Sequence, residues 1–119
     1  MTEFKEIRQL FDINVDNGFS EEEIFACKNV SEHIPKVLFD YYFQLGKIKK
    51  LNQTQDRLLE PKKLRFSKNL DFLIFYIENQ WTCVWGINIK DLSIDNPPVY
   101  MSYEENEWSK ETNLLTDFF

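Results

Sequence analysis

The chain has 119 residues, of which 43% are hydrophobic and 16% are aromatic. This composition excludes a disordered chain and fits one folded domain over residues 1–119. The net charge of −6 disfavours a general nucleic-acid binder, because phosphate contacts need Lys and Arg, and it suits a basic protein partner.

The first element expected along the chain is a helix from Thr2 to Phe11. Thr2 can cap this helix, and charged residues fill the positions between its apolar ones. The apolar side chains recur at helical spacing and define one face, made of Phe4, Ile7, Leu10 and Phe11.

A second helix is expected to open at Ser20, where the local signals are unusually complete. Ser20 and Glu23 have the spacing of a capping box, and Phe19 and Ile24 occupy the positions of a hydrophobic staple. The acidic triplet Glu21–Glu23 complements the positive end of the helix. A solvated first turn is the favoured interpretation of this triplet, with a partner-binding patch as the alternative.

A third helix should begin at Pro35 and stop at Gly46. Proline suits a first helical turn, and glycine is a natural C-terminal stop. Apolar side chains line one side of this helix, namely Leu38, Tyr41, Tyr42 and Leu45. A short strand over Leu64–Phe66 follows it.

Three strands are then expected. Leu73–Ile77 is apolar on both faces, which indicates a central strand covered on both sides. Trp81–Ile89 is rich in β-branched and aromatic residues and predicts a second strand, in which Gly86 marks a bulge or a close backbone approach. Val99–Tyr103 predicts a third strand at or near an edge, because two prolines precede it.

The chain should close with a polar loop and a helix. The loop spans Glu104–Lys110, and the helix face that follows is made of Leu114, Leu115, Phe118 and Phe119. Because that face is still apolar at Phe119, we expect it to lean on a partner or a second copy. The whole pattern predicts an α+β fold: N-terminal helices, then an antiparallel sheet with helices on one side, then a C-terminal helix.

Two stretches carry a family resemblance. The string ENQWTCVWGI (residues 78–87), followed by DNPPVY (95–100), resembles the signature of the SUKH superfamily, the Smi/Knr-type domain. Upstream, IPKVLFDYYFQLG (34–46) resembles the same family's Pro-initiated helix that ends in Gly. The resemblance covers roughly residues 24–115. It implies a fold first, since neither motif is catalytic, and in the bacterial branch it implies an immunity protein.

Chemistry-bearing motifs are sparse. His33 is the only histidine, its spacing from Cys27 does not match zinc ligands, and no glycine-rich phosphate loop is present. We therefore expect no catalytic residue, no metal and no cofactor. The N-terminus is charged and no apolar run approaches the length of a membrane span, so a soluble, cytoplasmic protein is expected. Cys27 and Cys83 should then be two reduced, buried thiols.

The candidate partner-binding residues are aromatic and acidic. Trp108 lies in an acidic loop, which predicts an exposed aromatic anchor inside an acidic rim. Trp81 lies beside a turn and is expected to be half exposed, whereas Trp85 should pack in the core. The acidic members of the rim are Glu104, Glu105 and Glu107.

Three functions follow as hypotheses. The first is a non-enzymatic immunity protein that neutralises a cognate toxin, as the resemblance implies, and an acidic surface suits the basic substrate cleft of a nuclease toxin. The second is a regulatory scaffold domain of the Smi/Knr type. The third is an enzyme of unrecognised class, which the missing motifs disfavour. The expected partner is a basic toxin domain, with no nucleic acid and no membrane, and the oligomeric state stays open.

Overall fold

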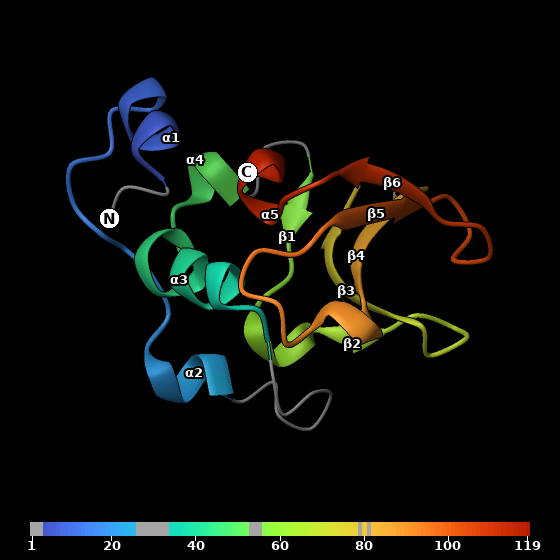
Figure 1. Ribbon diagram of the computed structural model, residues 1–119. Helices are drawn as coiled ribbons and strands as arrows, with labels where there is room; N and C mark the ends of the chain where they lie inside the picture. The colour runs from blue at the N-terminus through green and yellow to red at the C-terminus, as the bar shows by residue number, and fades with distance from the viewer. Residues whose placement is uncertain (1–3, 26–33, 53–55, 79, 81) are drawn as a thin grey trace.

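The computed structural model describes residues 4–25, 34–52, 56–78, 80 and 82–119, and it has an α+β fold (Figure 1). Figure 1 shows the helices gathered on one side of the sheet, as the sequence predicts. Within the described residues, no helix is both long and apolar enough to cross a membrane. In chain order the elements are α1 (Lys5–Leu10), α2 (Glu21–Phe25), α3 (Lys36–Leu45), α4 (Lys49–Asn52), β1 (Arg57–Leu58), the 3-10 turn η2 (Pro61–Lys63), β2 (Arg65–Phe66), β3 (Phe72–Ile77), β4 (Val84–Asn88), the 3-10 turn η3 (Ile89–Asp91), β5 (Val99–Ser102), β6 (Ser109–Thr112) and α5 (Leu115–Phe118).

Helix α1 buries less of its apolar face than the sequence predicts. Phe4 is buried and meets the ring of Tyr41 edge-on, with the ring centroids 5.3 Å apart. Leu10, however, is 78% exposed. The helix ends at Leu10, and the chain turns away at Asp12, whose φ of 55° is left-handed. The expected cap, Thr2, lies outside the described residues.

The start of α2 confirms the predicted capping box. The backbone N–H of Glu23 donates to Ser20 Oγ at 3.2 Å, and the backbone N–H of Ser20 donates to Glu23 Oε1 at 3.0 Å. The hydrogen bond from the Ser20 backbone N–H, followed by one from Lys47, lowers the pKa of Glu23. Ile24 is fully buried, so this short helix is fixed by its cap and by one core side chain.

The segment Asn17–Phe19 closes the C-terminal end of α3. The last carbonyls of a helix have no partner within it and need donors from elsewhere. Here the backbone N–H of Phe19 donates to the carbonyl of Tyr42 at 2.8 Å, and that of Asn17 donates to the carbonyl of Gln44 at 2.9 Å. A Cβ at Gly18 would lie 2.0 Å from a backbone oxygen of α3, so only glycine fits this close approach.

Asn52 completes the closure of α3. This buried side chain donates from Nδ2 to the carbonyls of Leu45 (2.8 Å), Gly46 (3.2 Å) and Ile48 (3.0 Å). Its Oδ1 accepts a hydrogen bond from the Tyr41 hydroxyl at 2.7 Å. Burial raises the pKa of Tyr41, which keeps the hydroxyl protonated as a donor. The predicted helix end at Gly46 is confirmed.

The sheet is antiparallel and is built around β3. The strand order is β1-β3-β4-β5-β6, and β2 also pairs with β3. Arg57 of β1 faces Ile77 and Arg65 of β2 faces Ile74, so the two short strands share one edge of β3. This confirms the prediction that residues 73–77 form a central strand buried on both faces.

A bulge in β3 decides which side chains face the helices. The register against β4 shifts between Ile74 and Tyr76, which leaves Phe75 as the extra residue. Phe75 and Tyr76 consequently both pack in the core beneath the helices. Ile74, Ile77 and Val84 form a smaller cluster on the opposite face, and Trp108 packs against it.

The expected third strand and polar loop need correction. Val99–Ser102 forms β5, but Ser109–Thr112, expected to begin within a loop, forms the edge strand β6 beside it. The sequence SKET carries no strand signal because all of β6 except Thr112 is exposed. Strand β4 is also shorter than predicted and begins at Val84.

The two phenylalanines of the predicted C-terminal apolar face pack against the chain's own aromatic rings. Phe119 stacks on Tyr41 of α3 with ring centroids 3.7 Å apart, and Phe118 meets Phe75 edge-on at 5.4 Å. The chain therefore covers these side chains in part, because α5 returns to the helix side of the sheet. Only Leu114 of that predicted face is strongly exposed, at 43%.

Candidate functional site

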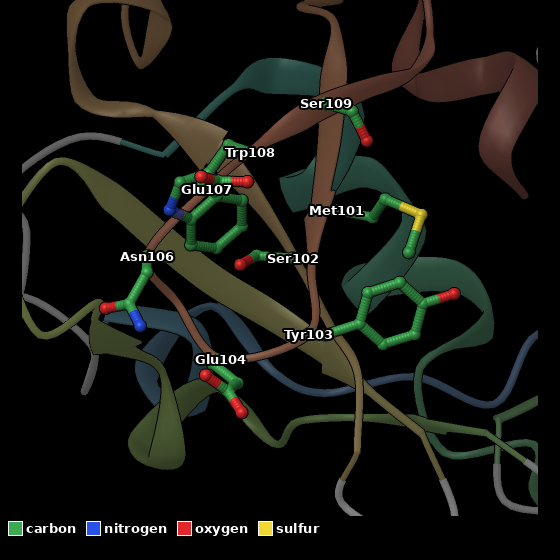
Figure 2. A pocket seen from close by; sticks show the side chains of 8 residues that line it. All are labelled: Met101, Ser102, Tyr103, Glu104, Asn106, Glu107, Trp108 and Ser109. Atoms are coloured by element: carbon green, nitrogen blue, oxygen red, sulfur yellow. The ribbon is translucent and has the colours of Figure 1, made fainter.

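The predicted partner-binding residues lie mainly on the hairpin loop that joins β5 to β6, residues 103–108, which we call the hairpin loop. It borders an open hollow of about 520 Å³ (Figure 2). In Figure 2, Met101 and Tyr103 point to one side of the hairpin, and Ser102 and Trp108 point to the other. The lining residues are Met101, Ser102, Tyr103, Glu104, Asn106, Glu107, Trp108 and Ser109.

Trp108 is half-buried rather than freely exposed, because it serves the fold. Its ring stacks on Phe72 of β3, with the ring centroids 4.1 Å apart and the planes 17° apart. Gly86 of β4 lies beside this stack, and a Cβ there would lie 3.0 Å from the Leu73 carbonyl oxygen and 3.3 Å from the Cβ of Phe72. The close approach predicted at Gly86 is thus confirmed, and the bulge of β3 lies opposite it.

Glu105 is committed to holding the hairpin loop in place. Its carboxylate accepts two hydrogen bonds from the Arg65 guanidinium, at 3.1 and 3.2 Å, and one from the backbone N–H of Lys68 at 3.2 Å. The hydrogen bonds from Arg65 hold the pKa of Glu105 below its usual range. Its φ of 61° is left-handed, so the loop turns sharply there.

The accessible part of the hairpin loop is therefore smaller than the predicted set. Glu104 and Glu107 are exposed, and Glu105 is not free to pair with a partner. Tyr103, which the sequence reasoning did not single out, is 71% exposed. Its position at the end of β5, directly before two glutamates, was the available signal. Trp81 lies outside the described residues.

Cys83 is buried and free, as predicted, and its Sγ lies 3.8 Å from the Val84 carbonyl oxygen. Burial raises the pKa of this thiol, and the carboxylates of Glu78, Glu111 and Asp56 raise it further. Cys27 and His33 lie outside the described residues. Within the described part of the chain, no group of three or more His, Cys, Asp or Glu side chains has a metal-holding arrangement.

Comparison of the chain with protein-family models, with curated proteins and with solved structures gives no match. The SUKH resemblance therefore enters the functional proposal only through the residues that carry it.

Proposed function

We propose that this protein is a non-enzymatic binding domain that acts as an immunity protein and neutralises a basic toxin domain, such as a nuclease. The observation that carries the proposal is the exposed tip of the hairpin loop. There, Tyr103 stands clear of the fold beside the exposed carboxylates of Glu104 and Glu107. Tyrosine is enriched among binding hot spots, and an acidic rim complements a basic partner. The net charge of −6 and the SUKH-like strings support the same function.

The hairpin loop is suited to this role because it is held in shape before any partner arrives. The Arg65–Glu105 ion pair anchors one point of the loop, and the stack of Trp108 on Phe72 anchors its end. A loop that is ordered in advance loses less conformational entropy on binding. Tyr103 would supply the anchor, and the free carboxylates would accelerate encounter with a basic surface.

The test is binding kinetics against the toxin domain encoded beside this protein's gene, at low and high salt. Tyr103→Ala should speed dissociation and weaken binding by about 2 kcal/mol. Neutralising the two rim acids (Glu104→Gln with Glu107→Gln) should slow association roughly tenfold at low salt, with little effect at high salt.

The matched control neutralises two exposed acids on α2, Glu21→Gln with Glu22→Gln, which changes the net charge equally. Equal slowing by both double variants would show that the effect is not specific to the hairpin loop, and would remove the loop from the interface. If the wild-type protein does not bind the toxin domain, the immunity function fails and the regulatory scaffold becomes the better hypothesis. Turnover of a small substrate would instead favour an enzyme.

A further inference from the structure

A second hollow lies on the helix side of the sheet, and we call it the aromatic groove. It has a volume of about 410 Å³ and runs between α5, the strand ends and α1. Three partly exposed rings form its floor. Tyr76 meets Phe118 at 5.1 Å and Trp85 at 5.6 Å, and Trp85 meets Phe118 at 5.8 Å, all between ring centroids. Such a floor presents both ring edges and ring faces to a ligand.

Carboxylates line the groove beside these rings. They belong to Asp56, Glu111 and Asp117, which come from three separate segments of the chain. Among the described residues that line the groove, none is Lys or Arg, and none of the three acids forms an ion pair within the described chain. Burial raises the pKa of both Tyr76 and Cys83, and the nearby charge of Asp56 raises both further.

We propose that the aromatic groove receives an arginine side chain of a basic protein partner. The inference rests on the proposed function and names the chemistry of the partner residue. A planar guanidinium stacks on aromatic faces, and its fork of N–H donors pairs with carboxylates, so this one side chain uses both the floor and the acids. A lysine ammonium is a compact, strongly hydrated charge and has no planar face to stack on an aromatic ring.

The groove and the hairpin loop share the edge strand β6, and Tyr103 lies on the same face of the sheet as the groove. Met101 pairs with Trp85 of the groove floor, and Tyr103 points to the same side of the hairpin as Met101. Ser109 of β6 lines the hollow at the hairpin loop, and Glu111 and Thr112 line the aromatic groove. A partner that approaches this edge therefore meets both hollows at once. The arginine would then occupy the groove while Tyr103 contacts the same partner farther along this edge.

The direct test is an NMR titration of the protein with the peptide acetyl-Gly-Arg-Gly-amide, followed at the Trp85 indole N–H. Two peptides serve as probes of chemistry, one with citrulline and one with lysine in place of arginine. The arginine peptide should shift the Trp85 signal, and the citrulline peptide should not. The groove variant Glu111→Gln with Asp117→Asn should weaken binding at least fivefold. Because both side chains are exposed, the variant should keep the wild-type spectrum elsewhere.

The matched control is Glu104→Gln with Glu107→Gln, which removes the same charge from the hairpin loop and should change the affinity less than twofold. Equal losses in both double variants, or equal binding of the citrulline peptide, would overturn the proposal. Equal or tighter lysine binding would overturn the arginine assignment. Dimers of the wild-type protein that the groove variant abolishes would assign the groove to a second copy instead.

The toxin-binding assay separates this inference from the proposed function. If the groove variant binds the toxin domain with the affinity of wild type, the groove does not receive an arginine of the toxin domain, and the proposed immunity function is unaffected. If wild type fails to bind the toxin domain, the proposed function fails, whatever the peptide does.

Discussion

Arg65 and Glu105 join β2 to the hairpin loop through two parallel hydrogen bonds, Nη1 to Oε1 at 3.1 Å and Nη2 to Oε2 at 3.2 Å. The two residues are 40 positions apart in sequence. Each belongs to a weak element, one to a two-residue strand and the other to a loop. The pair therefore fixes two segments that the backbone alone would hold loosely.

Removing this ion pair should lower stability in a pH-dependent way. Arg65→Gln should reduce the free energy of unfolding by about 1 kcal/mol at pH 7, since the arginine is 46% exposed and solvent screens the pair. The folded-state pKa of Glu105 is lowered, so its contribution is present above the unfolded value of about 4.3 and is lost as the pH falls through the folded value. Urea unfolding at pH 7 and pH 3 should show the difference from wild type shrinking at pH 3. Lys63→Gln is the charge-matched control. If Arg65→Gln lowers the free energy of unfolding equally at pH 7 and pH 3, the ion pair is not the cause of the loss.

Trp85 should tolerate phenylalanine better than its size indicates. Its indole Nε1 is buried and has no hydrogen-bond acceptor among the described residues. A buried, unpaired donor costs about 1–3 kcal/mol, so Trp85→Phe removes a penalty along with ring area and should change stability by less than about 1 kcal/mol. Trp85→Ala should cost about 3 kcal/mol, and Phe75→Ala, at a fully buried position, about 3–5 kcal/mol. Thermal melts followed by circular dichroism give all three values. An equal loss for the Phe and Ala variants of Trp85 would mean that the indole N–H has a partner.

Substitution of Trp108 should affect mainly stability, and substitution of Tyr103 should affect mainly partner binding. Trp108→Ala deletes a ring stacked on Phe72 and should lower the free energy of unfolding by about 2 kcal/mol. Tyr103→Ala removes an exposed side chain and should leave stability within about 0.5 kcal/mol of wild type. Urea titrations of the two variants, run beside the toxin-binding assay, check this assignment. A stable Trp108 variant would contradict the stack, and an unstable Tyr103 variant would place that ring in the fold.

Cys83 should be a slow nucleophile. The thiolate is the reactive form, and burial with nearby carboxylates raises the pKa of this thiol. In the native protein at pH 8, iodoacetamide should modify Cys83 at least tenfold more slowly than in urea-unfolded protein. Peptide mass spectrometry measures both rates at this residue. We also expect Cys27 and Cys83 to be alkylated together after unfolding without reductant. A disulfide between them would contradict the expected reduced state.

The sequence predicted best those elements whose signals are local. The capping box of Ser20 and Glu23 needs only four consecutive residues, and the apolar run of β3 shows directly that both faces are covered. β6 was missed because an exposed edge strand has no alternating apolar pattern to reveal it. Edge strands of this kind are set by their neighbour, here β5, rather than by their own composition.

The candidate site was harder to predict because distant residues decide it. Nothing near Glu105 or Trp108 in sequence indicates that Arg65 and Phe72 will engage them. These contacts depend on how the sheet twists and where the hairpin loop folds back. Sequence reasoning expected Trp108 to be the exposed aromatic residue of this loop, whereas the fold stacks Trp108 on Phe72 and leaves Tyr103 exposed.

The segment Asn17–Phe19 has no regular secondary structure, yet its local stability depends on α3. Its amides at Asn17 and Phe19 donate to helix carbonyls, and Gly18 lies flat against the helix backbone. Opening this segment alone would remove hydrogen-bond donors from the carbonyls of the last turn of α3, so the segment and that turn form one cooperative unit. In deuterated solvent, the amides of Asn17 and Phe19 should therefore exchange as slowly as those in the last turn of α3. The segment thus behaves as part of α3 rather than as a linker between helices.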